Sequence, residues 1–507
     1  MKLRRIIQIG AALAAVLFLA GCILQPSEDA TGTISLAVSA PDAGISASAL
    51  NIGDQTGVDP STANVARLWM YANGGEYRLA PTSADASSSR NYVEASLDSG
   101  TGQITIDGIP AGDGYSVVVV LGRKVNDVFV PMAYARSGRF AVNAGLETVV
   151  SPSKVALVGD TDSPLSSASF SLIGENLNSV LVSGGMPVTA SSTKVWTNGS
   201  ELSLGNLSPS PSRVYSVSVG DSGYFVNTDK GIAWSSDGGL YTTSNTAGIT
   251  DVTYSSSFFL SDTSDRVVFY QRLGGLGGVV FNSESLPAAA DWQDFGPDDL
   301  QDLVDPDASP VRAMASGTQK GFFATAALDN FMVTRTLFDS DSDIEAADLI
   351  SGEAEGVTFF NVPYPGTTRP MRIDEMAVVT VNSTEYLAIG TPRGAFVFPV
   401  STIGSSDSSL FDSTRNLVNS NAASFRSLIR DEPVAALNSE GGWLAIATSE
   451  SVTLLNMTNG IPTSREDATL ILPRRGVTLG QTTGLAIDTA SGTLYIAGTE
   501  GISAVKK

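Results

Sequence analysis

Short runs of alternating apolar and polar residues recur along most of the chain, separated by clusters of Gly, Ser, Asn and Asp. A period of two is typical of β-strands that bury one face, and the turn-forming clusters mark where strands end. Stretches with the 3.6-residue period of an amphipathic helix are scarce. The pattern therefore predicts an all-β protein made of many short strands.

The stretch from residue 33 to 158 is expected to fold as a small β-sandwich. Its strand candidates are GTISLAV, VARLWMYA, QITIDGIPAGDGYSVVVVLG, PMAYARSGRFAV and LETVVSPSKVAL. In the third, Pro110 is expected to fix a turn and Gly112 to supply its permissive backbone position. That stretch resembles a motif of carboxypeptidase-regulatory-like and transthyretin-like sandwiches, which implies a spacer or binding module. Residues 159–166 are interpreted as a linker.

Residues 167–507 contain a recurring unit of an apolar strand, a turn, an aromatic-led strand, a polar turn and another apolar strand. Such units stack because none buries enough apolar surface alone, and repeated four-stranded sheets around an axis form a β-propeller. The sequence therefore predicts a propeller, with seven blades preferred and six as the alternative. The copies begin at Asn178, Tyr215, Ile249, Val311, Met376, Pro433 and Gly484. The expected leading residues of their second strands are Tyr224, Phe259, Phe323, Tyr386, Trp443 and Leu494.

The last copy contains only three strands, and an open sheet edge invites association. Residues 167–174 form the one unassigned alternating segment, with Phe170 and Leu172 on one face. We therefore expect this segment to pair with the C-terminal strand near Ile502. Asn198-Gly199 is expected to form a hairpin turn in the first blade.

One blade carries a family signature. Ser235, Asp237 and Gly239 fit the Ser-x-Asp-x-Gly pattern of BNR, or Asp-box, blades, whereas Tyr241 and Thr242 depart from it. The segment therefore resembles sialidase-like propellers, in which the box is a structural hairpin turn. The resemblance implies a fold and no sialidase chemistry.

Residues 1–21 have a basic head, an apolar run and small residues before Cys22, the order of an export signal. The run is too short for a bilayer core, which needs about 20 residues. Leu19-Ala20-Gly21-Cys22 resembles the lipobox of bacterial lipoproteins. That resemblance implies that Cys22 becomes an acylated N-terminus, that residues 22–32 are a tether, and that the protein is anchored in the cell envelope. Ile23, in place of Asp, favours the outer membrane.

Composition narrows the chemistry. Without the three basic residues of the signal, 27 basic residues face 52 acidic ones, a net charge of −25 that disfavours a nucleic-acid partner. The chain has no histidine, which excludes Ser-His-Asp and Cys-His catalysis and histidine-bound zinc. Cys22 is the single cysteine, so the exported body has no disulfide.

Three segments are candidates for a metal-binding, phosphate-binding or surface site. Asp339, Asp341 and Asp343 alternate like a calcium loop, but Ile344 and Ile350 stand where an EF-hand needs Gly and Glu, so a solvated acidic loop is the alternative. The acidic insertion 291–309 reads as a short helix or a solvated loop. LGGLGG at 273–278 lacks the end of a P-loop and reads as a turn between strands. No residue is nominated for catalysis or for a cofactor.

Two functions remain open. The first is a lipid-anchored, non-enzymatic propeller that binds a protein or glycan partner. The second is an envelope glycan hydrolase or lyase that uses carboxylates and Tyr, by analogy with sialidase-like propellers. Paired carboxyl groups at a suitable separation would mark the enzyme.

Overall fold

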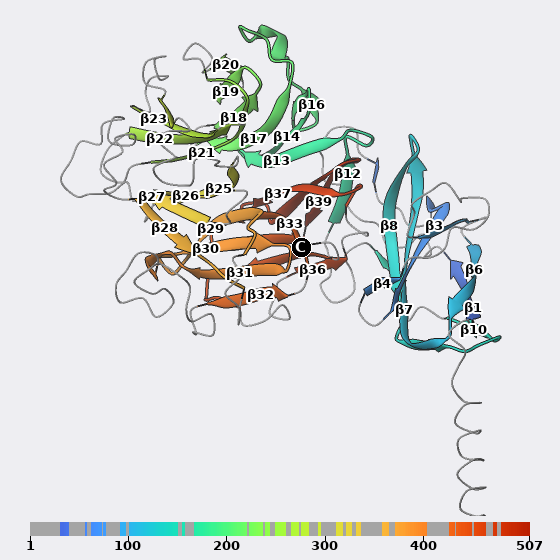
Figure 1. The fold of residues 1–507 in the computed structure, drawn as a ribbon. Coiled ribbons are helices and arrows are strands. Elements are labelled where there is room, and N and C mark those ends of the chain that lie inside the picture. The colour runs from blue at the N-terminus through green and yellow to red at the C-terminus, as the bar shows by residue number, and fades with distance from the viewer. Residues whose placement is uncertain are drawn as a thin grey trace, which may run out of the picture. The chain divides into compact units, whose positions relative to one another are not determined.

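The computed structural model is built from β-strands and turns, with two short 3-10 turns, η2 (Leu204–Asn206) and η5 (Val400–Thr402), among the residues it describes. The all-β fold class is confirmed. The chain divides into two compact units, one built mainly from β1 and β3 to β11 and the other from β2 and β12 to β39 (Figure 1). The described residues are 31–39, 56–57, 62–72, 75–77, 92–97, 101–150, 155–157, 167–220, 223–236, 239–243, 249–259, 265–272, 275–282, 293–295, 311–317, 321–326, 331–335, 357–364, 371–402, 425–430, 432–448, 451–462, 470–473 and 478–506.

The described strands of the first unit form two sheets. The smaller sheet has the strand order β10-β1-β6, and the larger has β11-β8-β7-β3-β4, with β5 paired to β3 and β9 to β7. In β6, Ile104 and Ile106 are buried while Thr105 between them is exposed, so one face of the sheet covers apolar side chains. The bounds are β1 (Thr31–Ser39), β3 (Val65–Ala72), β4 (Gly75–Tyr77), β5 (Val93–Ser96), β6 (Thr101–Pro110), β7 (Gly112–Val125), β8 (Val128–Arg136), β9 (Phe140–Val142), β10 (Glu147–Val149) and β11 (Val155–Leu157).

The turn from β6 to β7 differs from the prediction in which glycine it uses. Gly112 is the first residue of β7 and is not among the described glycines with positive φ, whereas Gly108 and Gly114 have φ of 76° and 81°. The Tyr115 hydroxyl donates to the Pro110 carbonyl at 2.9 Å and spans the junction. The glycines with a left-handed backbone conformation, Gly108 and Gly114, therefore lie before and after the turn at Pro110 and not within it.

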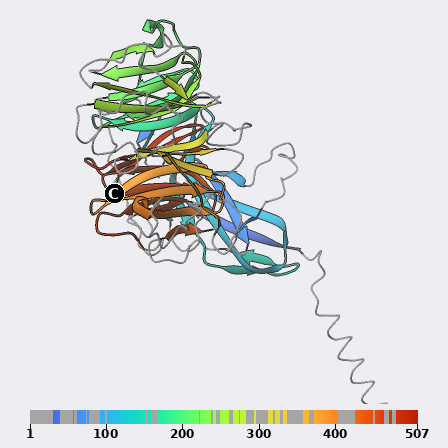
Figure 2. The same cartoon turned by 60° about the vertical axis from the view of Figure 1, so that its left-hand side comes forward.

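The second unit contains, within the described residues, seven antiparallel sheets. Six of them consist of four successive strands, and the last has three successive strands that are completed from elsewhere in the chain. The sheets follow one another from green to red in Figures 1 and 2. The first three are β13 (Leu177–Ser183), β14 (Met186–Ser191), β15 (Val195–Thr197) and β16 (Ser200–Glu201); β17 (Val214–Gly220), β18 (Gly223–Thr228), β19 (Gly231–Ser236) and β20 (Gly239–Thr243); and β21 (Val252–Phe259), β22 (Asp265–Arg272), β23 (Gly275–Asn282) and β24 (Gln293–Phe295).

The remaining sheets have the same form. They are β25 (Val311–Gly317), β26 (Gly321–Ala326), β27 (Phe331–Arg335) and β28 (Val357–Asn361); β29 (Glu375–Val381), β30 (Thr384–Thr391), β31 (Gly394–Pro399) and β32 (Arg426–Arg430); β33 (Val434–Glu440), β34 (Trp443–Thr448), β35 (Ser451–Asn456) and β36 (Leu470–Pro473); and β37 (Thr482–Asp488), β38 (Thr493–Gly498) and β39 (Gly501–Lys506). Each sheet begins at one of the predicted copies of the repeat.

The first strand of each sheet, here called the inner strand, contacts the inner strand of the next sheet, and β37 contacts β13. These contacts close a ring. Neighbouring inner strands run in the same direction, since Tyr215 and Ser216 of β17 bond to Asp251 and Thr253 at the start of β21. Apolar side chains from adjacent sheets pack between them, as Leu181 and Val188 do with Val217 and Tyr224.

A buried polar network also joins two adjacent sheets. Asn227 donates to Ser216 and Ser218 at 2.9 and 3.0 Å and accepts from Ser255 at 2.8 Å. Asn227 and Ser255 are fully buried. Because every member of the network is bonded, the network fixes the register of β17 against β21 with little cost of burial.

The last sheet is completed by β12 (Ser167–Ser171), as predicted from the sequence. β12 pairs antiparallel with β39, with Phe170 opposite Ser503 and Ser171 opposite Ile502. The strand ends before the predicted residue 174 because Leu172 has a φ of 49°, which turns the chain. Ser169 and Ser171 are buried as well as Phe170, so both faces of β12 are covered.

One strand of this sheet was not expected. β2 (Thr56–Gly57) pairs with the other edge of β12, Thr56 opposite Phe170 and Gly57 opposite Ser169. The sequence analysis assigned these two residues to the sandwich. A two-residue strand has no detectable alternation, so the hydrophobic pattern could not place it.

The residues expected to lead the second strands lie in those strands in five of six cases among the described residues. Tyr224, Phe323, Tyr386, Trp443 and Leu494 lie in second strands, but Phe259 is the last residue of the inner strand β21. Pairing of Phe259 with Arg266 extends β21 beyond the predicted turn. Tyr224 and Leu494 are buried in cores between sheets, which supports their interpretation as packing residues.

Candidate functional site

The inner strands of the ring begin at one end, and the turns between second and third strands lie at the same end. The Asp229 amide, in the turn between β18 and β19, donates to the Arg213 carbonyl just before β17. The Glu500 amide, in the turn between β38 and β39, donates to Leu479 just before β37. We call this end of the ring the strand-start end. Loops gathered on a rigid scaffold in this way are common positions for binding residues.

A hydroxyl side chain caps three of the second-to-third turns. Thr228 donates to the Gly231 carbonyl and accepts from the Lys230 amide; Thr391 does the same with Gly394 and Arg393. Thr448 repeats the arrangement with Ser451. The sequence signal is Thr-x-x-Gly or Thr-x-x-Ser after an apolar strand, and sequence analysis missed it. The cap makes these turns fixed points from which charged side chains project.

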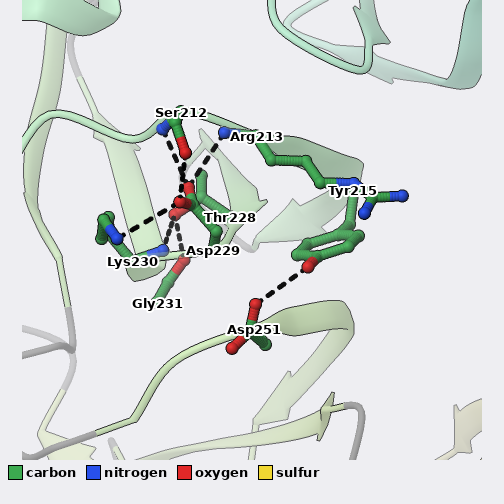
Figure 3. A network of polar contacts seen from close by, with 8 residues as sticks. All are labelled: Ser212, Arg213, Tyr215, Thr228, Asp229, Lys230, Gly231 and Asp251. Atoms are coloured by element: carbon green, nitrogen blue, oxygen red, sulfur yellow. Dashed lines mark hydrogen bonds and ion pairs between the residues drawn. The ribbon is translucent and has the colours of Figure 1, made fainter.

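Asp229 is the centre of a polar cluster at this end (Figure 3). Its carboxylate accepts from the Ser212 hydroxyl at 2.6 Å and from the Ser212 and Arg213 amides at 2.9 and 3.0 Å, and the Lys230 ammonium lies at 3.3 Å. Burial alone would raise the pKa of Asp229, but these donors outweigh it and lower the pKa. Asp229 is therefore a charged anchor that holds the loop before β17 to the turn after β18.

Beside it, Tyr215 joins two sheets. Its hydroxyl donates to Oδ1 of Asp251 at 2.9 Å, and the Arg213 guanidinium lies over its ring, 4.7 Å from the centroid (Figure 3). Burial and the Asp251 carboxylate together raise the pKa of Tyr215. Asp251 has a φ of 55°, a left-handed conformation that Asp tolerates better than most residues. The three side chains form a pre-organised group that is only partly covered.

A comparable group precedes β29. Nε of Arg372 contacts both carboxylate oxygens of Asp374 at 2.9 and 3.1 Å, and the Arg393 guanidinium lies 6.0 Å from the centre of the Tyr364 ring. Arg372 and Arg393 are exposed, while Tyr364 is half-buried. The strand-start end thus presents a second combination of arginine, tyrosine and aspartate.

Glu375 and Tyr254 face the interior of the ring. Glu375 is the first residue of β29 and accepts a hydrogen bond from the Leu437 amide of β33, yet burial raises its pKa to about 8. Burial, together with the charge of Glu375, raises the pKa of Tyr254 in β21 to about 12. Both residues are partly exposed. A neutral carboxyl group at neutral pH can donate a hydrogen bond there.

The residues nominated from sequence fall largely elsewhere. Cys22 and the aspartates Asp339, Asp341 and Asp343 lie outside the described residues, as does Asp237. Ser235 lies within β19 opposite Leu240, and Gly239 begins β20 opposite Ser236. Among the described residues, no three acidic side chains come together in a way that could hold a metal ion.

The structure describes parts of the other two candidate segments, 273–278 and 291–309. In 273–278, Gly275 pairs with Arg272, and Gly277 and Gly278 lie in β23, so the segment belongs to the junction between two strands, as predicted. In the acidic insertion, Gln293–Phe295 form the outer strand β24, whereas the short helix predicted from Pro297 onward falls outside the described residues. Pairing with Leu276 to Gly278 satisfies their backbone groups, and that edge could not be foreseen from local sequence.

Comparisons with known proteins leave the chain without a family. No family model matches it, and no curated protein matches it. Among the solved structures, 573 chains match. One is the extracellular domain of a B. thetaiotaomicron protein assigned to the one-component systems, with 14% identity and a TM-score of 0.40, over 66% of this chain and 40% of that one. No helix among the described residues is long and apolar enough to span a membrane.

Proposed function

We propose that this chain is a lipid-anchored binding protein of the bacterial cell envelope, whose ring of sheets is a seven-bladed β-propeller that engages a protein or glycan partner. Acylation of Cys22 attaches it to the membrane, with the outer membrane favoured. The first unit, a transthyretin-like sandwich, acts as a spacer between the anchor and the ring.

The observation that supports this proposal is the set of fixed, partly exposed polar and aromatic side chains at the strand-start end. Arg213, Tyr215 and Asp251 hold one another in place there while keeping partial exposure. Fixed polar and aromatic groups on a rigid scaffold lower the entropy lost on binding. This is what a recognition surface requires, and it needs no reactive group.

The alternative, a glycan hydrolase or lyase, is supported by Glu375. A carboxyl group with a pKa near 8 is suited to act as a general acid. Such an enzyme also needs a second carboxylate at a fixed separation. The adjacent Asp374 is bonded to Arg372, which favours a structural role for that carboxylate.

One experiment separates the two functions. The full chain with Cys22→Ser is purified and applied to immobilised envelope polysaccharide and to isolated envelope proteins, and the supernatant is assayed for new reducing ends and unsaturated sugars. Saturable binding without product is expected. Release of product would replace the proposal with the enzyme, and the absence of binding to either fraction would reject it.

A further inference from the structure

We propose that the strand-start end of the ring binds a neutral oligosaccharide, with Arg213, Tyr215 and Asp251 as its contact group. This inference rests on the proposed function and narrows its partner to one chemical class. It is carried by the hydrogen-bonding capacity left on these three residues and by the distribution of exposed apolar side chains.

The contact group still has donors and acceptors to offer. The Arg213 guanidinium stacks on the Tyr215 ring, but within the described residues none of its donors has a bonded acceptor. Asp251 uses Oδ1 for the Tyr215 hydroxyl, and a carboxylate has about four lone-pair sites. Donors and acceptors therefore lie side by side in one group, an arrangement that suits vicinal sugar hydroxyls, each of which both donates and accepts.

The group is also held in position before any ligand arrives. The Asp229 carboxylate binds the Ser212 and Arg213 amides, so the backbone that carries Arg213 is fixed. Tyr215 is held by Asp251 from the neighbouring sheet. Its half-buried ring leaves an amphipathic surface, against which the C–H face of a sugar ring can pack while the hydroxyls reach the polar groups.

A protein partner is less well matched to this end. Protein interfaces depend on a desolvated apolar or aromatic centre. Among the described residues of the second unit, two large apolar side chains are exposed. They are Met186 and Val219, with exposed fractions of 43% and 55%. Both lie at the other end of the ring, since Met186 begins β14 and Val219 is near the end of β17.

Charge selects neutral sugars over acidic ones. Within the cluster, Lys230 and Arg213 balance the charges of Asp229 and Asp251, so no net positive charge is left there for an acidic sugar. The chain without its signal carries a net charge of −25, from 27 basic and 52 acidic residues. A uronic or sulfated sugar would therefore meet repulsion from the chain as a whole. A neutral sugar would not.

The test uses the full chain with Cys22→Ser and isothermal titration with maltohexaose, cellohexaose, mannohexaose and a hexamer of galacturonate. At least one neutral probe should bind, and the galacturonate hexamer should bind more weakly. Arg213→Ala should weaken binding about tenfold, and Tyr215→Phe, which keeps the ring and removes the bond to Asp251, a few-fold. Arg139→Ala, at an exposed arginine of the first unit, is the matched control and should leave affinity unchanged.

Each of the other possible results would overturn a stated part of the proposal. Neutral binding that Arg213→Ala and Tyr215→Phe leave unchanged would overturn the contact group while the proposed function stands. Preference for galacturonate would overturn the charge argument. Binding of an envelope protein with no binding of any sugar would overturn the inference and keep the proposed function, whereas failure to bind either would remove both.

Discussion

Glu375 sets a pH response for the ring at the scale of one residue. Its folded pKa of about 8 lies above the ordinary value of 4.5, so the folded protein holds a proton that the unfolded chain releases between these two values. Stability is therefore greatest below about pH 4.5 as far as this group is concerned, and it falls as pH rises toward 8. The cause is burial of the carboxyl group, which disfavours its charged form.

We predict that Glu375→Gln flattens this part of the pH profile. The amide keeps an acceptor for the Leu437 amide and cannot ionise, so the variant should be more stable than the parent by about 1–3 kcal/mol at pH 9 and nearly equal to it at pH 4. Urea unfolding at a series of pH values measures the difference. Glu147→Gln, at an exposed position of the first unit, is the control and should leave the parent slope in place. A Gln variant with the parent slope would mean that Glu375 is ionised in the folded protein.

At the scale of elements, closure of the ring depends on β12. Phe170 is fully buried there and pairs with Ser503 of β39. Removing its ring leaves a cavity at the contact between two segments from opposite ends of the unit. Large-to-small changes of a buried phenylalanine cost about 3–5 kcal/mol.

We predict that Phe170→Ala loosens the last sheet first. Amide hydrogen exchange should accelerate in β39 and β12, while β3 and β7 of the first unit keep their protection. Met186→Ala removes an apolar side chain that is 43% exposed and should change exchange little. Uniform acceleration in both units would argue against a local role for β12 in closure.

Sequence periodicity was sufficient for the sheets but not for the site. Alternation marks a strand that buries one face. The last copy of the repeat has three strands in sequence where the other copies have four, and this shortage pointed to β12 as the strand that completes the sheet. Pairs that depend on long-range packing left no local trace, as for β2, for β24 and for the extension of β21 to Phe259. Glu375 is an ordinary glutamate in sequence, and only its enclosure by neighbouring sheets gives it an unusual pKa. Tyr215, Asp229 and Asp251 are far apart in sequence and are brought together only by the ring. The sequence therefore offered no reason to predict them as site residues.

At the scale of the whole molecule, the proposed attachment to a membrane rests on Cys22. Multiple acyl chains give stable anchoring because each buried CH₂ contributes about 0.8 kcal/mol. The net charge of −25 left by 27 basic and 52 acidic residues repels anionic headgroups, so the lipid would be the sole attachment.

We predict that Cys22→Ser abolishes anchoring. The variant should leave the detergent phase on phase separation and should not incorporate labelled palmitate. Gly21→Ala keeps a small residue before the cysteine and should still be labelled. A Cys22→Ser protein that remains in the detergent phase would show that another segment provides the attachment.

The pairing of β12 with β39 also governs when the second unit can finish folding. Ser167 is opposite Lys506, so β12, which precedes the first inner strand of the ring, must meet the last strand of the unit. A ribosome has released Ser167 long before it adds Lys506, and until then the sheet edges at both ends lack their partners. Contacts between segments so distant in sequence form slowly, and unpaired edges of a growing chain are where strands of neighbouring chains add. Closure of the ring therefore has to wait for the synthesis of β39, and the interval before closure is the period in which this chain is most open to aggregation.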